Sequence, residues 1–284
     1  RHLPLFQYRP QRAIQFYLPV EGENSTEILE NLEKEVSTLD ENWTGVRPAK
    51  IPMVPELLTA TQFNTVVTEK ENNKFYIGLN KATTQLESFD LFNGHSLGLF
   101  TANKKQLNLL APFLVQQFFE QGCEVILIDA LKSLEVFSDK AKLYLSREDV
   151  NNHLTELKEM IDLLLVQKVS EKKQIIIFNG IAEILEKNFY QQPQFLTLIE
   201  QNTEMRQIIF MDYQTKVGDN FAMPTVVARE NITQILFGGE LSSQHFVENL
   251  PIGVKNEIYQ RNVLHCVKDE ELSHIVVPAM QEEM

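Results

Sequence analysis

A short polar segment, Thr101 to Gln106, follows the apolar run Leu97–Phe100 and leads directly into a segment with helical periodicity. Many nucleotide-binding proteins have a phosphate-binding loop in this position. Glycines of such a loop let backbone N–H groups wrap the phosphate oxygens, a lysine contacts the β- and γ-phosphates, and a Ser or Thr hydroxyl holds Mg²⁺. The usual spacing is G-x-x-x-x-G-K-[S/T], against which the segment can be compared.

Only part of this spacing is present. A frame that begins at Gly98 keeps one glycine and Lys104, but it has Asn103 for the second glycine and Lys105 for the hydroxyl. A frame that begins at Thr101 keeps none of the four residues. Lysines beside a helix N-terminus attract an anion weakly, but without the second glycine side chains occupy the space where N–H groups would point inward. We interpret these four residues as a degenerate nucleotide-binding segment, and the two lysines as solvated surface residues.

The run Ile175–Phe178 is followed by Asn179 and Gly180. An ATPase of this architecture has an acidic pair here, which orders Mg²⁺ and polarises the attacking water. Asn179 has no charge and Gly180 has no side chain, and the loss of one preorganised electrostatic group typically costs about 10²–10³ in rate. We therefore predict no catalytic residue and no bound metal, and we expect no cofactor; any binding of ATP with Mg²⁺ would be weak.

Acidic residues follow two other apolar runs. Asp129 comes after Val125–Ile128 and is a further candidate for nucleotide binding, and Asp212 comes after Ile208–Met211. An Asp that follows a strand is more often a turn or N-cap residue than a metal ligand, so we favour that interpretation. The six histidines show no paired metal-ligand spacing.

The positions of these residues depend on an alternation of strands and helices. The apolar runs are short and rich in Ile and Val, which is typical of strands that are buried on both faces. The five runs are Leu97–Phe100, Val125–Ile128, Ile175–Phe178, Ile208–Met211 and Ile232–Phe237. Apolar stripes of helical spacing lie between them, at Leu107–Phe118 (with Pro112 expected to kink it), Leu154–Leu165 and Phe195–Ile199. This order predicts an α/β fold with a mostly parallel, doubly wound sheet and helices on both faces. The stretch from Tyr259 to Val277 is expected to add strands at a sheet edge.

The first fifty residues differ from the rest. They hold several of the prolines and one helix, which we predict over about 25–39 because Asn24 and Glu27 resemble a capping box and an apolar stripe follows. The other face of this helix is acidic, and we interpret it as a surface helix whose apolar stripe docks on the neighbouring domain. We therefore divide the chain into a connector and end of a preceding domain at 1–50, and one α/β domain at 51–284.

Composition excludes several functions. The 284 residues include 26 Lys and Arg and 39 Asp and Glu, which gives a net charge of −13. Such a chain lacks the dense basic face that DNA or an anionic lipid surface requires. Two cysteines cannot build a disulfide scaffold, and no apolar run approaches the length of a membrane-spanning helix. Because the chain begins with Arg1, we expect it to be part of a longer protein, with any membrane anchor in the missing N-terminal part.

Several segments together resemble a known family. Ile51–Glu56, Phe75–Asn80 and Phe89–Leu91 resemble the lead-in of FtsK/SpoIIIE-type ATPase domains, most of all the tandem domains of the type VII secretion ATPase that is called EssC in Firmicutes. Val125–Lys132 resembles the second strand of that family, and Lys172–Leu185 resembles its acidic-pair strand and the next helix. The resemblance covers about 48–284, and it depends on order and spacing rather than on one motif. It implies a RecA-like, P-loop NTPase-type fold.

The departures from the family pattern imply a particular role. A degenerate phosphate loop and a missing acidic pair are typical of the last domain of these ATPases. The resemblance therefore implies a catalytically inactive C-terminal module at the cytoplasmic face of the bacterial membrane. Its implied partners are secreted WXG-type helical-hairpin proteins and effectors and the upstream ATPase domains of the same chain, within a machine that forms homo-hexamers, with no nucleic acid.

Two other functions compete with this one. The first alternative is a working nucleotide-binding domain that powers protein export, with Lys104 or Lys105 on phosphate and Asp129 or Asp212 on the metal. The second is an unrelated small-molecule enzyme, for which we find no polar cluster in the sequence. For substrate recognition, the segment Leu236–Leu250 is one candidate groove, although core packing explains its apolar residues better.

Overall fold

The computed structural model describes residues 20–45, 53–55, 57–67, 71–152, 171–188, 199–214, 232–247, 250–256, 260, 262–268 and 271–279. The chain divides into two compact units, Arg1–Ile51 and Pro52–Met284. The predicted helices at Leu154–Leu165 and Phe195–Ile199 lie almost wholly outside the described residues.

The first unit contains one described helix, α1 (Ser25–Asn42). The side chain of Asn24 accepts hydrogen bonds from the backbone N–H groups of Thr26 and Glu27, which are otherwise without partners at a helix start. Glu27 accepts from the backbone N–H of Glu23. The predicted cap is therefore present, and the helix runs three residues beyond its predicted end.

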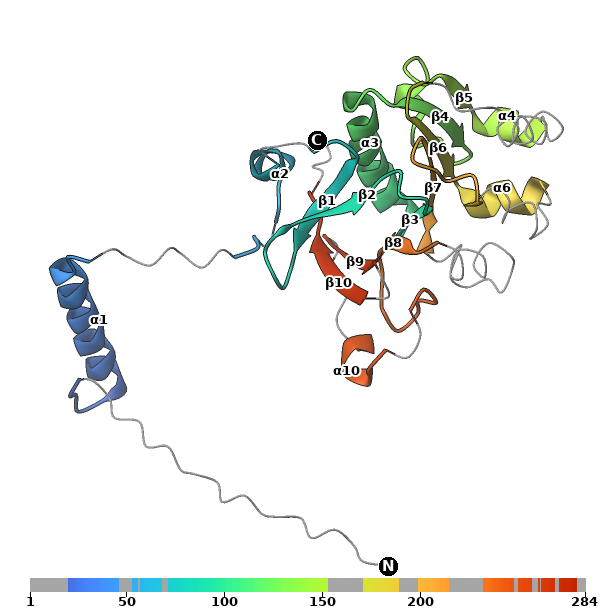
Figure 1. The fold of residues 1–284 in the computed structure, drawn as a ribbon. Coiled ribbons are helices and arrows are strands. Elements are labelled where there is room, and N and C mark those ends of the chain that lie inside the picture. Colours follow the sequence, from blue (N-terminus) through green and yellow to red (C-terminus); the bar gives the residue numbers. More distant parts are fainter. Residues whose placement is uncertain are drawn as a thin grey trace, which may run out of the picture. The chain divides into compact units, whose positions relative to one another are not determined.

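The second unit is built on one ten-stranded sheet (Figure 1). Its strands in chain order are β1 (Lys74–Asn80), β2 (Leu86–Asp90), β3 (Leu97–Thr101), β4 (Glu124–Asp129), β5 (Leu143–Leu145), β6 (Gln174–Asn179), β7 (Arg206–Tyr213), β8 (Gln234–Phe237), β9 (Val263–Lys268) and β10 (Glu271–Val276). Their order in the sheet is β2-β1-β10-β9-β8-β3-β7-β6-β4-β5. The six strands from β8 to β5 are parallel, and the other four are joined by antiparallel pairing.

The five predicted strands are all present, and they form the buried centre of the parallel half. Each residue of β3, β6 and β8 is buried, as continuous apolar runs predict for strands covered on both faces. The hairpin β9–β10 does not lie at the edge that we expected. It lies inside the sheet, because β1 and β2 extend the sheet beyond it.

The described helices of this unit are α2 (Ala60–Val66), α3 (Lys104–Glu120), α4 (Arg147–Asn152), α6 (Ile181–Asn188), α10 (Ile252–Lys255) and the 3₁₀ turn η1 (Glu135–Phe137). On one face of the sheet α3 packs on alternate residues of the central strands, such as Leu99, Ile177 and Met211. On the other face α6 and α4 pack on the residues between them, such as Phe100 and Phe178. The α/β fold with helices on both faces is therefore confirmed (Figure 1).

Candidate functional site

The loop between β3 and α3 is too short to surround a phosphate. Two residues, Ala102 and Asn103, separate the end of β3 from the start of α3. Asn103 is the N-cap residue of the helix, and its side chain accepts a hydrogen bond from the N–H of Gln106 at 3.0 Å. Thr101 donates its hydroxyl to the carbonyl of Asn103 at 3.0 Å. The side chains that could meet a ligand here are therefore used to end the strand and begin the helix.

The side chain of Gln106 occupies a backbone donor of this loop. Its Oε1 accepts from the N–H of Ala102 at 2.9 Å. A Cβ on Gly238, which follows the neighbouring strand β8, would lie 2.8 Å from the same oxygen and 2.7 Å from the nitrogen of Ala102. A phosphate oxygen would need the N–H group that this amide already holds. We did not predict a role for Gln106 from the sequence. Its position three residues after the N-cap residue Asn103 was the pattern that could have indicated one.

The structure separates the residues of the degenerate segment. Gly98 lies within β3 rather than in the loop, and a Cβ there would lie 2.5 Å from the ring of Phe100. Position 98 is therefore a glycine because the ring of Phe100 leaves no room for a larger side chain, and not because a phosphate binds there. Lys104 and Lys105 lie exposed in the first turn of α3. Neither the second glycine nor a hydroxyl is supplied by another part of the loop.

At the end of β6, where an ATPase would have an acidic pair, this chain has the side-chain amide of Asn179. Asn179, at the end of β6, is fully buried and donates to Asp129 Oδ1 and to Ser133 Oγ, each at 2.6 Å. Its own Oδ1 is buried without a hydrogen-bond partner. The next residue, Gly180, has a φ of 88°, and a Cβ there would lie 2.8 Å from Leu131. Glycine is thus required by the turn and by close packing, not by a phosphate.

Asp129 has its carboxylate surrounded by protein donors. Besides Asn179, it accepts from the backbone N–H of Ser133 at 3.3 Å, from that of Leu134 at 2.8 Å, and from the Tyr144 hydroxyl at 3.1 Å. Burial, with the charge of Asp129 as a further cause, raises the pKa of the Tyr144 phenol above its usual value. Tyr144 therefore stays protonated and donating. The carboxylate holds the turn after β4, as we favoured from its sequence position.

Asp212 lies on the other face of the sheet. It belongs to the face of Phe100 and Phe210, because residues alternate along β7, whereas Asp129 lies on the face of α3. Its carboxylate accepts from the N–H of Ala182, near the start of α6, at 2.9 Å. Asp129 and Asp212, the two alternative metal ligands, therefore lie on opposite faces of the sheet.

The phosphate loop and the acid position lie at the same carboxyl edge of the sheet. Leu99 is paired with Met211, Met211 with Asn179, and Asn179 with Asp129. Neighbouring strands lie about 4.8 Å apart, so Asn179 is about 10 Å from the end of β3, with β7 between them. This corner has the topology of a nucleotide site. The N–H of Ala102, the side-chain N–H groups of Asn179 and the carboxylate of Asp129 are already hydrogen-bonded to protein here, so a phosphate or a magnesium ion would have to displace those bonds.

A histidine pair that the sequence did not single out adjoins this corner. His265 and His274 are directly opposite on β9 and β10, with their Nδ1 atoms 3.0 Å apart. Nε2 of His265 lies 3.0 Å from the carbonyl of Gly239. Because a carbonyl only accepts, Nε2 carries the proton, and His274 then donates to Nδ1 of His265. The sequence predicted strands in this stretch but not the register of the hairpin β9–β10, which pairs the two histidines.

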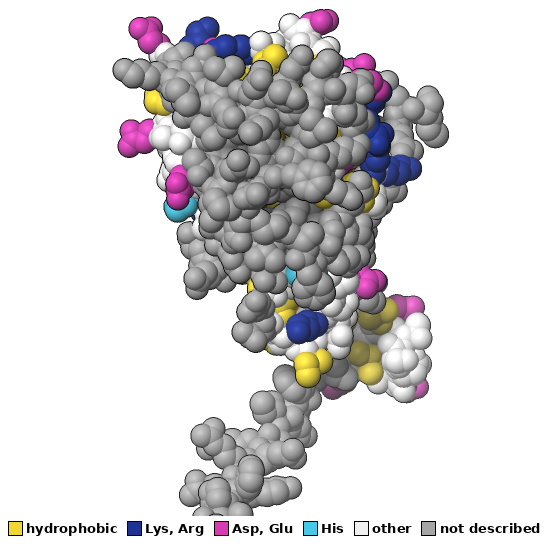
Figure 2. Space-filling view, turned by 90° about the vertical axis from the view of Figure 1, so that its right-hand side faces the viewer, with side chains coloured by type: hydrophobic (Ala, Val, Ile, Leu, Met, Phe, Trp, Pro, Cys, Tyr) yellow, Lys and Arg dark blue, Asp and Glu magenta, His cyan; other side chains and the backbone are white. Residues whose placement is uncertain are grey.

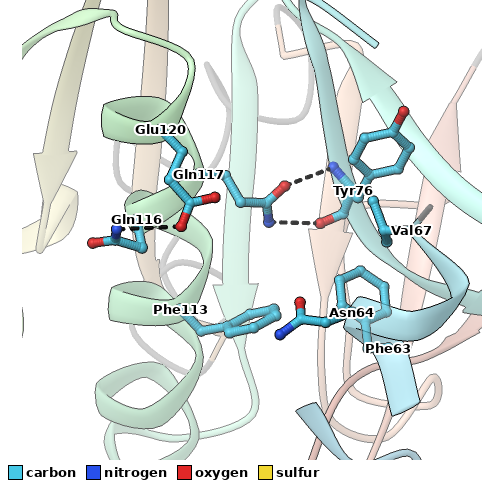
Figure 3. Close-up of a pocket in the computed structure, with 8 residues that line it drawn as sticks. All are labelled: Phe63, Asn64, Val67, Tyr76, Phe113, Gln116, Gln117 and Glu120. Atoms are coloured by element: carbon cyan, nitrogen blue, oxygen red, sulfur yellow. Dashed lines mark hydrogen bonds between the residues drawn. The ribbon is translucent and has the colours of Figure 1, made fainter. Parts of the chain in front are cut away.

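A cavity of about 450 Å³ lies away from the corner, among α2, β1 and α3 (Figure 3). Phe63 and Phe113 meet edge to face on its apolar side, with ring centroids 5.7 Å apart. Val67 and Tyr76 continue the apolar wall, and polar side chains complete the lining. The polar residues are Asn64, Gln116, Gln117 and Glu120. A concave surface of this size with a few polar groups suits an apolar side chain of a peptide.

The back of this cavity is rigid because Gln117 holds β1. Its side-chain amide accepts from the backbone N–H of Tyr76 at 3.2 Å and donates to the carbonyl of Tyr76 at 2.9 Å (Figure 3). One turn later, Gln121 makes the same kind of bond to Asn73 and Lys74. Gln117 and the C-cap residue Gln121 thus pair with the backbone at the start of β1 as another strand would. Neither was among our candidate residues.

The described charges do not form a basic surface on the face shown in Figure 2. Lys and Arg side chains there form small separate groups, with Asp and Glu side chains around the same margin. Among the described residues, Lys74 and Lys268 both pair with Asp90, and Lys142 pairs with Glu124. No group of metal-ligating side chains is found within the described parts of the chain. None of the described helices is long and apolar enough to cross a membrane.

Fold and site together define the class: a domain with the architecture of a P-loop NTPase, whose nucleotide corner is filled by its own side chains. No protein-family model matches the chain. The sequence is 28% identical over 120 residues, 41% of the chain, to the ESX secretion system protein EccC of Geobacillus thermodenitrificans. The structure matches EssC (ATPases 2 and 3) of the same species with a TM-score of 0.64 and 18% identity, over 93% of this chain and 53% of that one. It also matches Thermomonospora curvata EccC (ATPases 2 and 3) in complex with a signal sequence peptide, with a TM-score of 0.65 and 13% identity, over 91% and 50%.

These comparisons confirm the predicted resemblance to the ATPase domains of type VII secretion proteins. The chain spans 8% of the length of the curated relative and about half of the two structures. What those longer proteins do as a whole is therefore carried to this chain only as a proposal. The position of this domain as the last of its protein stays a prediction.

Proposed function

We propose that this chain is a catalytically silent module at the C-terminal end of a type VII secretion ATPase, which recognises secreted proteins and regulates the active upstream domains. The proposal rests on the hydrogen bonds that the protein's own side chains make at the nucleotide corner. Gln106 holds the donor that a phosphate would need, and Asn179 with Asp129 replaces an acidic pair by one buried, fully hydrogen-bonded carboxylate. A working ATPase requires these groups for the transferred phosphate and its magnesium ion.

Recognition of secreted proteins is supported by the cavity at α2, β1 and α3. It combines aromatic walls with a polar rim, as peptide-recognition grooves do. One structural relative was solved with a signal sequence peptide, which supports peptide binding in this class of domain. The segment Leu236–Leu250 is a weaker candidate, because Phe237, Leu241 and Phe246 are buried in the core.

In this proposal the ligands of the module are secreted helical-hairpin (WXG-type) proteins and effectors. The upstream ATPase domains of the same protein are its neighbours in a hexameric machine. The module lies at the cytoplasmic face of the membrane, to which an upstream part of the protein anchors it. No nucleic acid takes part. The net charge of −13 supports this last point.

Calorimetric titration of the whole chain with Mg-ATP tests the silent corner. We expect no heat of binding up to millimolar nucleotide and no phosphate release over hours. The double variant K104A/K105A should behave like the wild type. Tight binding that this double variant abolishes would establish the alternative, a nucleotide-binding domain that powers export.

A binding assay with the secreted helical-hairpin proteins encoded nearby tests recognition. Asn64 is exposed on the rim of the cavity and Thr65, the next residue of α2, does not line it. N64W should weaken binding at least tenfold by filling the entrance, whereas T65W should leave it unchanged. Equal effects of both variants would place recognition elsewhere.

A further inference from the structure

Taken within its own unit, helix α1 has an apolar stripe that no described residue of that unit buries. Leu29, Val36 and Leu39 are each 57–62% exposed, and no residue of the helix is buried. Isolated helices of this length are marginal in water, and most helical stability in proteins comes from packing of an amphipathic face. A helix of 18 residues with such a stripe is therefore expected to be stabilised by a partner.

The stripe has the spacing of a coiled-coil seam. Leu29, Leu32, Val36 and Leu39 follow one another at intervals of three, four and three residues, which places them alternately at positions a and d of a heptad. Trp43, just beyond the helix end, continues the spacing and is 56% exposed. Leucine at d and a β-branched residue at a favour a two-stranded pairing. The occupant of this face is thus best described as another helix.

The charges that flank the seam of α1 limit which helix can bind it. The positions that flank the seam, e and g, hold Glu33, Glu35 and Asp40 and no basic residue. The one basic residue of α1, Lys34, is at the outward position f. In coiled coils the e and g charges select the partner, because opposite charges attract across the seam and like charges repel. The flanks of α1 therefore call for lysines or arginines on the other helix.

The same charges argue against three other partners for the apolar face of α1: a second copy of the chain, the rest of the same chain and a lipid surface. A second copy in parallel register would place Glu35 against Asp40 of its partner twice, and an antiparallel copy would also pair acidic flanks. Helix α1 has six acidic residues and one lysine, a charge of −5, so the rest of the chain carries −13 − (−5) = −8 and offers no net complementary charge. An anionic lipid surface is disfavoured for the same reason.

We propose that α1 is one half of a heterotypic coiled-coil contact, and that its partner is a helix of a separate protein with an apolar seam and basic flanks. This contact uses neither the nucleotide corner nor the cavity at α3. It can therefore fail without affecting the proposed function, and the proposed function can fail without affecting it.

The test uses the whole chain and two synthetic 21-residue heptad peptides, both with Ile at a and Leu at d. One has lysine at e and g, and the other has glutamate there. By fluorescence anisotropy we expect the lysine peptide to bind at least tenfold more tightly than the glutamate peptide. The variant L32Q/L39Q should lose this binding at least tenfold, because glutamine keeps helix propensity but removes the seam. Circular dichroism of this variant checks that the helix content is retained.

Two matched charge reversals separate pairing from non-specific attraction. E35K/D40K changes the flanks, and E30K/E41K makes the same change in net charge on the outward face. The first should reverse the preference toward the glutamate peptide, and the second should change both affinities by less than threefold. Equal effects of the two reversals, or no binding of the lysine peptide to the wild type, would overturn the proposal. Self-association of the chain that L32Q/L39Q abolishes would also overturn it, by showing a second copy on this face.

Discussion

The buried amide of Asn179 touches the carboxylate of Asp129, and this contact defines the chemistry of the corner. Asn179 donates to Asp129 at 2.6 Å, and three further protein donors surround that carboxylate. An aspartate at position 179 would instead place two carboxylates within hydrogen-bonding distance, where both cannot be ionised. The amide thus lets the strand end with one negative charge, which suits a structural turn rather than a magnesium site.

This argument predicts that N179D is destabilised in a pH-dependent way. One carboxyl of the new pair would have its pKa raised above the unfolded value, so folding would be weakened as the pH rises from about 4 through that raised pKa. We expect a loss of about 3–4 kcal/mol at pH 8 and little loss at pH 4, from a pKa increase of about two to three units. Urea unfolding at several pH values measures it.

The swap D129N/N179D is the matched control, because it keeps one carboxylate and one amide in contact. It should recover most of the loss at pH 8. A destabilisation of N179D that does not change with pH would show that shape, not charge, determines the residue at this position.

At the scale of elements, α3 joins the two halves of the sheet. It packs on the parallel strands through Leu107 and Leu114, and it binds β1 through the amides of Gln117 and Gln121. Strand β1 pairs with β10 over two residue pairs, Leu79 with Val276 and Asn80 with Ile275. Near the start of β1, the N–H and C=O of Tyr76 bond to Gln117 of α3, and the N–H of Asn73 and the C=O of Lys74 bond to Gln121, the C-cap residue of that helix.

We predict that Q117L lowers the free energy of unfolding by about 1–3 kcal/mol, because the N–H and C=O of Tyr76 would lose their partners. Q116L, one residue earlier, should change it by less than about 0.5 kcal/mol. Gln116 bonds only within its own helix among the bonds described, to Glu120 at 3.3 Å. Urea unfolding compares the two variants, and equal effects would show that the amide of Gln117 does not support β1.

At the scale of the whole molecule, the net charge determines whether the chain can bind a polyanion such as DNA. A charge of −13 repels nucleic acid. Several described lysines pair with neighbouring carboxylates, such as Lys132 with Glu148. DNA translocation, the task of FtsK itself, needs the opposite surface.

We therefore predict no gel shift of duplex DNA by the full chain at 50 mM salt and micromolar protein. The same preparation at 200 mM salt is the comparison, because phosphate contacts weaken steeply with salt. A shift at low salt that disappears at high salt would reveal a basic surface and restore a nucleic-acid function.

The sequence by itself determined the properties that depend on residue type and local period. Continuous apolar runs predicted β3, β4, β6, β7 and β8, and Asn24 predicted the start of α1, because burial on both faces and helix capping are local requirements. The lack of a charge at position 179 and of a side chain at position 180 could likewise be seen directly, since no fold can supply a carboxylate to Asn179 or a side chain to Gly180.

Only the tertiary structure decided what fills the corner. Asp129 and Asn179 are 50 residues apart, Gln117 and Tyr76 are 41 apart, and His265 meets His274 through the register of a hairpin. The face on which Asp212 lies depends on the alternation along β7, and the inner place of β9 and β10 depends on where β1 pairs. Such contacts follow from strand order and register, which long-range packing sets and a linear pattern does not contain.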